Sequence, residues 1–162
     1  MAGGVQIFGA RNSQEARMPG IVKAYGPASL TTGNRQPTTA IISPLKEPQK
    51  MAREIALALA NRKAGDVLVM DIREVAPFIA DFFILATALT HDHARALADE
   101  ATEVLLGNDL VPHHTEGYER ARWILVDADE VVVHIMTQDA REFYAIESLW
   151  GDARIERYGD KS

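Results

Sequence analysis

Two apolar runs that meet at a short polar connection constrain the fold of this chain more than any other feature. The runs are RWILVDA and VVVHIM, and the connection is DADE at residues 127–130. β-Branched and aromatic residues dominate both runs, which is typical of strands. A connection this short fits only a β-hairpin. The sequence therefore predicts an antiparallel strand pair with Asp127 and Asp129 at its tip.

The remaining segments alternate between helical and strand patterns. We predict a helix over 48–65, strands over 66–72 and 81–89, a helix that Thr90 caps and Gly107-Asn108 ends, an edge-like segment at 110–117, and a last helix over 139–150. The last helix places Phe143, Ile146, Glu147 and Trp150 on one face, and we interpret Phe143 and Trp150 as core residues. This order predicts an α/β fold in which helices flank a mixed β-sheet.

Charge divides the chain into two parts. Residues 1–50 carry six basic and two acidic side chains, whereas residues 51–162 carry 11 basic and 21 acidic ones, a net charge of −10. An acidic body disfavours sequence-specific nucleic-acid binding and favours a basic partner surface. RNA binding by the basic N-terminal part is a weaker alternative.

The segment before the first helix has no strand or helix periodicity. We predict that residues 1–46 are a disordered N-terminal extension and that residues 47–162 form one α/β domain. No apolar run approaches the roughly 18 residues of a membrane-spanning helix, so we expect no membrane partner. The expected location is cytoplasmic, or organellar if residues 1–46 are a transit peptide.

Asp127 and Asp129 are the strongest candidates for catalysis. Two carboxylates separated by one residue can hold Mg²⁺ for nucleotidyl transfer or phosphate ester hydrolysis. That chemistry also needs a segment that cradles phosphate, and none precedes these residues. We therefore favour the interpretation that both are turn residues and keep the metal-dependent enzyme as the alternative.

Other kinds of catalytic and cofactor site find little support. The chain has no cysteine, which excludes disulfides, thiolate zinc sites and cysteine nucleophiles. The spacing of His91 and His93 does not place them on one helix face, and His134 is expected to be a satisfied, partly buried strand residue. We expect no metal and no cofactor. Trp123 follows the charged segment ERAR, so its ring could lie at a sheet edge as an interface anchor.

Three segments resemble the ribosomal silencing factor (Iojap) family in order and spacing. They are ADFFILATALTHDHARALADE, EGYERARWILVDADEVVVHIM and AREFYAIESLWGD, and the resemblance runs from about Gln49 to Asp152. It implies a nucleotidyltransferase-like fold without the catalytic carboxylates, and a protein that is not an enzyme. It further implies a translational repressor, a homodimer when free, that binds protein number fourteen of the large ribosomal subunit and blocks association with the small subunit.

The resemblance also implies that the residues of this chain that match the family's motifs bind the partner. The matching residues are Glu116, Gly117, Trp123, Asp127, His134, Arg141, Tyr144 and Glu147. Trp123 would be the desolvated anchor of the contact. The alternative for the last three residues is that they hold the final helix against the sheet.

The chain departs from the family pattern in two loops. Ala88 replaces a glycine and Asp92 a basic residue after the second strand, and Asp129-Glu130 stands where Gly-Asp is common. Loss of a turn glycine requires either negative φ or an Asp that tolerates the left-handed region. Contacts that the family makes through these two loops are therefore in doubt for this chain.

Overall fold

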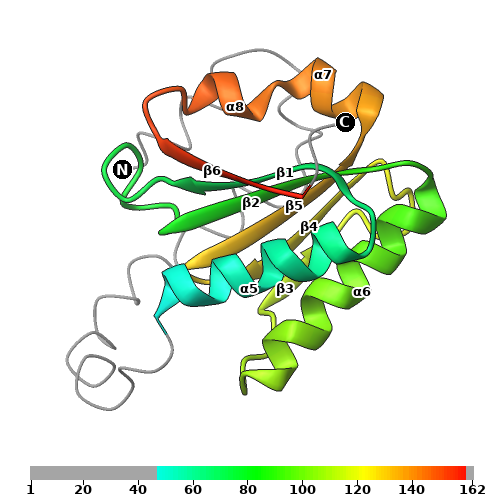
Figure 1. Ribbon diagram of the computed structural model, residues 1–162, viewed down its shortest axis with the longest axis horizontal. Coiled ribbons are helices and arrows are strands. Elements are labelled where there is room, and N and C mark those ends of the chain that lie inside the picture. The colour runs from blue at the N-terminus through cyan, green and yellow to red at the C-terminus, as the bar shows by residue number, and fades with distance from the viewer. Residues whose placement is uncertain (1–46, 160–162) are drawn as a thin grey trace.

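The computed structural model describes residues 47–159, which fold around one mixed sheet (Figure 1). The predicted extension at residues 1–46 lies outside the described residues. The elements are α5 (Pro48–Asn61), β1 (Gly65–Asp71), β2 (Phe82–Ala88), α6 (His91–Gly107), β3 (His114–Glu116), β4 (Trp123–Ala128), β5 (Val131–Thr137), α7 (Gln138–Tyr144), α8 (Ile146–Leu149) and β6 (Arg154–Tyr158). None of these helices is long and apolar enough to cross a membrane.

The strands of the described residues form one six-stranded sheet in the order β3-β4-β5-β2-β1-β6. The predicted hairpin is confirmed: β4 and β5 are antiparallel, and pairing of Ala128 with Val131 leaves only Asp129 and Glu130 in the loop. β2 and β5 are parallel and lie side by side, and the other neighbouring strands are antiparallel. The predicted mixed sheet of an α/β fold is therefore confirmed.

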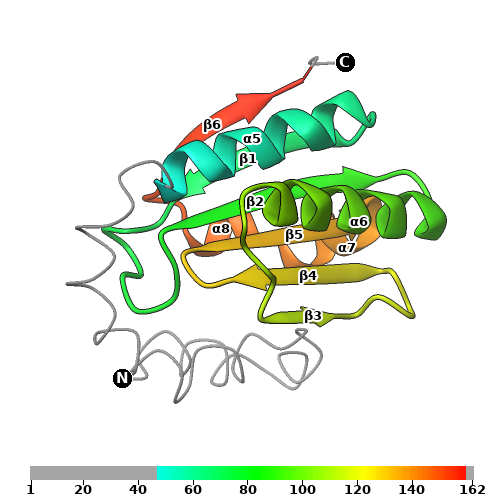
Figure 2. The same cartoon turned by 90° about the horizontal axis from the view of Figure 1, so that it is seen from below.

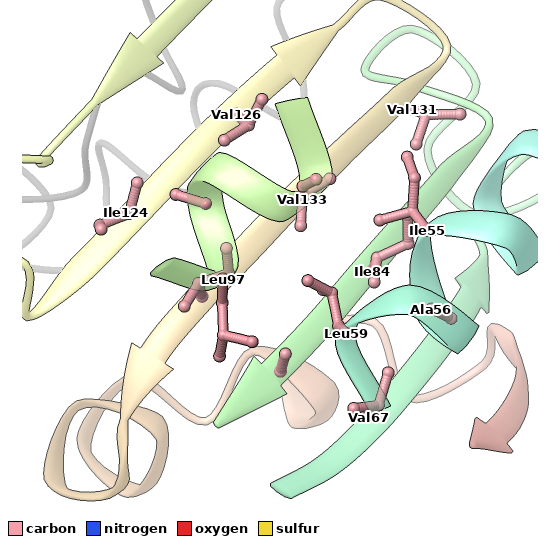
Figure 3. Packing of buried hydrophobic residues seen from close by; sticks show 14 of the residues in the cluster. Ile55, Ala56, Leu59, Val67, Ile84, Leu97, Ile124, Val126, Val131 and Val133 are labelled. Carbon is pink, nitrogen blue, oxygen red and sulfur yellow. The ribbon is translucent and has the colours of Figure 1, made fainter. Parts of the chain in front are cut away.

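Helices cover both faces of the sheet. α5 and α6 lie on one face and α7 and α8 on the other (Figures 1 and 2). On the first face, Ile55 and Leu59 of α5 and Leu97 of α6 pack against Ile84 and Val133 of the central strands (Figure 3). Because both faces are covered, β2, β4 and β5 are buried along their whole length. These strands form the rigid centre of the molecule.

Because β2 and β5 are parallel, their C-terminal ends, and the connections that follow them, lie at the same end of the sheet. β2 ends at Ala88 and leads into α6, and β5 ends at Thr137 and leads into α7. α6 packs on one face of the sheet and α7 on the other, so the two connections diverge. In open α/β sheets, ligands bind where neighbouring strands send their helices to opposite faces. This edge is therefore a natural place to look for a site.

The last third of the chain differs from the prediction in three ways. The single helix expected over 139–150 is broken at Ala145, whose φ of 45° lies in the left-handed region. Phe143, which precedes the break, is 52% exposed and not a core residue, whereas Trp150, which follows it, is buried as predicted. β6 was not predicted at all. It pairs with β1 along its whole length and closes that side of the sheet.

Candidate partner-binding surface

Trp123 lies in the interior, and the expectation that its ring faces a partner is wrong. Its side chain is 5% exposed, and its indole Nε1 donates a hydrogen bond of 3.2 Å to Nδ1 of His134. Strand alternation explains this, since Trp123 and Leu125 project to the face that α7 and α8 cover. Trp123 is therefore a core residue beneath α7 and does not itself contact a partner.

His134 is fully buried, more so than predicted. Burial and the nearby charge of Arg141 lower the pKa of its imidazole to about 3. Because Nδ1 accepts the hydrogen bond from Trp123, the single proton of the neutral ring sits on Nε2. Nε2 has no hydrogen-bond partner among residues 47–159. His134 is thus a neutral core residue that cannot contact a partner directly.

Aromatic rings connect this buried pair to the surface. The Tyr144 ring lies 4.6 Å from the Trp123 ring, and the Phe143 ring lies 5.0 Å from that of Tyr144, centroid to centroid. Tyr144 is half-buried and Phe143 is exposed. The first pair is tilted and the second is edge-to-face, and such ring pairs stabilise one another by dispersion and quadrupole interactions. The buried tryptophan therefore fixes the position of two aromatic residues that reach solvent.

Arg141 and Glu147 form part of the support for α7. The buried guanidinium of Arg141 donates to Thr87 Oγ1 at 2.8 Å, to the Asp66 carbonyl at 3.1 Å and to a carboxylate oxygen of Glu147 at 3.1 Å. These contacts tie α7 to the end of β2 and the start of β1. The structure therefore favours the alternative role for Arg141 and Glu147, which is to hold this helix against the sheet.

Gly117 and Glu116 belong to the connection between β3 and β4. Gly117 has φ of 77°, and a Cβ atom at this position would lie 2.1 Å from the carbonyl oxygen of Trp123. Only glycine fits such a backbone without displacing β4. Glu116 is half-buried and pairs with His114. The glycine of the E-G motif therefore has a backbone role, whatever else the loop contacts.

Arg95 of α6 holds this connection in place, and the sequence analysis did not identify it. Its guanidinium donates to the carbonyls of Tyr118 at 3.1 Å and Glu119 at 2.6 Å. The hydroxyl of Tyr118 donates to the carboxylate of Asp99 at 2.9 Å. An arginine in the first turns of a helix gives no sequence signal for such a contact, because its targets are backbone carbonyls 23 and 24 residues away.

Asp129 lies in the turn, as the favoured interpretation predicted, whereas Asp127 is a buried residue of β4 that pairs with Val132 and is not part of the turn. The backbone N–H of Asp129 donates to Asp127 Oδ1 at 3.0 Å, and Asp129 has φ of 72°, the left-handed conformation that aspartate tolerates. Burial raises the pKa of Asp127, and Asp129 pairs with His113 at 3.0 Å. Within residues 47–159 no cluster of His, Asp or Glu has the geometry of a metal site.

The eight candidate residues thus separate by depth. Trp123, Asp127, His134 and Arg141 are buried, whereas Glu116, Gly117, Tyr144 and Glu147 reach the surface at least in part. The first four shape the surface, and only the second four can touch a partner without rearrangement.

Comparison with known proteins identifies the relatives of this chain. Residues 45–161 match the family described as ribosomal silencing factor during starvation. The chain is 35% identical to ribosomal silencing factor RsfS of Bacillus subtilis over 108 residues, which are 66% of this chain and 91% of the relative. It is 25% identical to the chloroplastic protein Iojap of Zea mays over 147 residues, 90% of this chain and 63% of that one.

A solved structure has the same fold. A crystal structure of a Chromobacterium violaceum protein superposes with a TM-score of 0.63 at 31% sequence identity, covering 72% of this chain and 91% of the other. The family match, the relatives and the solved structure all point to the same family. The chain belongs to the ribosomal silencing factor family.

Proposed function

We propose that this chain represses translation by binding the large ribosomal subunit at its protein number fourteen and sterically blocking association with the small subunit. The observation that carries the proposal is the family match over residues 45–161, which includes every described strand and helix. The match itself supports a ribosome-associated silencing role, and the binding partner and the mode of action are the proposed part.

The architecture suits a protein that acts by occupying a surface. The central strands are buried on both faces and the β3–β4 connection is held by Arg95, so the exposed loops rest on a rigid body. A preorganised surface loses little conformational entropy on binding. The net charge of −10 over residues 51–162 favours encounter with a basic protein surface over exposed RNA.

Sedimentation with separated ribosomal subunits tests the proposal. We expect the purified chain to sediment with large subunits and not with small ones, and to reduce the formation of complete ribosomes from the two. The reduction should disappear when the large subunits lack protein number fourteen. Failure of the chain to bind intact large subunits would contradict the proposal.

The oligomeric state and location of the chain are part of the same proposal. We expect a homodimer when the chain is free, which sedimentation equilibrium would show as twice the 17.8 kDa mass of one chain. The Zea mays relative is named as chloroplastic. This relative supports an organelle as one possible location of the chain. We propose a cytoplasmic location, and cell fractionation would distinguish the two.

A further inference from the structure

A hollow of about 570 Å³ lies at the edge where β2 and β5 end. The turn from Leu89 to His91 forms one wall, and Thr137, Gln138, Asp139 and Glu142 at the start of α7 form the other. This is the point at which the helices that follow two parallel strands diverge to opposite faces of the sheet. Side chains from two separate crossovers thus converge on one open site.

One exposed apolar side chain, that of Leu89, lines this hollow on a fixed backbone. Leu89 is 78% exposed, although its backbone N–H is held by Nδ1 of His93 at 3.0 Å and the other ring nitrogen of His93 lies 2.8 Å from the Arg62 carbonyl. A side chain whose backbone is held in this way offers a preorganised apolar contact to a partner.

The walls of the hollow carry negative charge and no lysine or arginine. A hydrogen bond from the hydroxyl of Thr137 and the nearby charge of Arg122 lower the pKa of Asp139, which keeps this carboxylate ionised. Glu142 accepts a hydrogen bond of 2.9 Å from the amide of Gln138. The start of α6 is already capped, since Thr90 Oγ1 accepts from the backbone N–H of His93. Asp139 already pairs with Arg122, whereas Glu142 has no ion pair among residues 47–159, so Glu142 is the carboxylate that can attract a cation to the hollow.

The surroundings of the hollow are preformed. Arg122 is the last residue of the β3–β4 connection and bridges it to α7 through Asp139, with its Nη2 3.0 Å from a carboxylate oxygen. Arg95 fixes the same connection from the side of α6. The two crossovers and the β3–β4 connection are thus joined by side chains, and a partner would meet one rigid surface.

We propose that this hollow receives a lysine or arginine side chain from a basic segment of the ribosomal partner. Its aliphatic part would pack on Leu89, and its charged head would lie between Glu142 and Asp139. The charge complementarity and the exposed leucine select this occupant. The inference rests on the proposed function and places its contact at the end of β2 and β5, beside the buried tryptophan and not on it.

Binding of the full chain to isolated large subunits tests the inference. Glu142→Lys reverses one charge of the hollow, and we expect at least a tenfold weaker affinity. Leu89→Ser removes the apolar contact and should weaken affinity by about threefold to tenfold, because the partner side chain then buries less apolar surface. Circular dichroism should show both variants folded, because both side chains are exposed.

Matched controls lie on the exposed side of α6, away from the hollow. Glu103→Lys and Leu106→Ser make the same chemical changes at exposed positions and should leave the affinity unchanged. If the wild-type chain binds and all four variants bind equally well, the inference is wrong and the proposed function stands. If Glu142→Lys binds more tightly, a basic segment of the chain itself is the occupant, which also overturns the inference. If the wild-type chain does not bind, the proposed function falls as well.

Discussion

Gly117 shows how one residue fixes the geometry of an exposed connection. Alanine there would adopt an unfavourable φ of 77° and place its Cβ 2.1 Å from the backbone oxygen of Trp123, so β4 or the connection must move. We expect Gly117→Ala to lower the free energy of unfolding by about 2–4 kcal/mol. Urea denaturation measures the change.

Gly107 at the end of α6 is the control. A Cβ atom there meets nothing within 4 Å, and its φ is not in the left-handed region. Gly107→Ala should be neutral or stabilise the fold by up to about 1 kcal/mol. Similar losses at both positions would show that Gly117 has no special backbone role.

His134 makes stability depend on pH. Its pKa is about 3 in the folded chain and near 6.5 when unfolded, so below pH 6.5 the unfolded state binds a proton that the folded state does not. The free energy of unfolding should therefore fall as pH decreases from 6.5 towards 3, by about 1.4 kcal/mol per pH unit from this residue. Urea denaturation at several pH values measures the slope.

A variant that cannot titrate isolates this contribution. His134→Gln keeps an acceptor for the indole of Trp123 but has no ionisable group, so its stability should depend less on pH in the same window. Replacement of the exposed His91 by Gln should leave the wild-type slope unchanged. Equal slopes for His134→Gln and the wild type would contradict the assignment.

Among the elements, α7 is tied to the start of β1 and the end of β2 by one buried guanidinium, that of Arg141. Lysine at position 141 cannot reproduce the fork of donors that binds Thr87, Asp66 and Glu147. We expect Arg141→Lys to destabilise the fold by about 2–4 kcal/mol, because buried partners lose their donors. Arg157 also pairs with Asp66, but on the surface, so Arg157→Lys should change stability by less than about 1 kcal/mol. Equal effects in thermal denaturation would show that burial of Arg141 does not matter.

The sequence predicts an element when its own residues determine the structure, and fails when the structure depends on contacts with distant segments. β2, β4 and β5 are continuous apolar runs, so local sequence is enough to identify them. The segment RIERY of β6 is mostly charged and becomes a strand only because β1 offers it a paired edge. The same reason applies to Trp123. Its motif identified an important residue, but its burial depends on α7 and α8, and no glycine or proline marks the break between these two helices.

At the scale of the whole molecule, the fold places its candidate site at the same kind of sheet edge that binds ligands in other α/β proteins. The residues at this edge offer an exposed leucine and carboxylates. Asp127 and Asp129 lie near the other end of β4, Asp127 buried within the strand and Asp129 in the turn that follows it. The arrangement therefore supports capture of a protein side chain better than binding of a phosphate. The alternative of a metal-dependent enzyme is testable by calorimetric titration with Mg²⁺ and Mn²⁺, and we expect no heat of binding.

The dependence of affinity on salt separates two ways in which the whole chain could hold the ribosome. Contacts between basic residues and RNA release counterions, with a slope of log K against log salt of about −0.7 to −0.9 per phosphate. If the six basic residues of positions 1–50 all bound RNA, the slope would be about −4 to −5. Docking of one partner cation in the hollow releases few ions, so we expect a slope shallower than about −2 between 50 and 200 mM KCl at constant Mg²⁺. A steep slope would show that the basic N-terminal part, and not the acidic domain, provides most of the affinity.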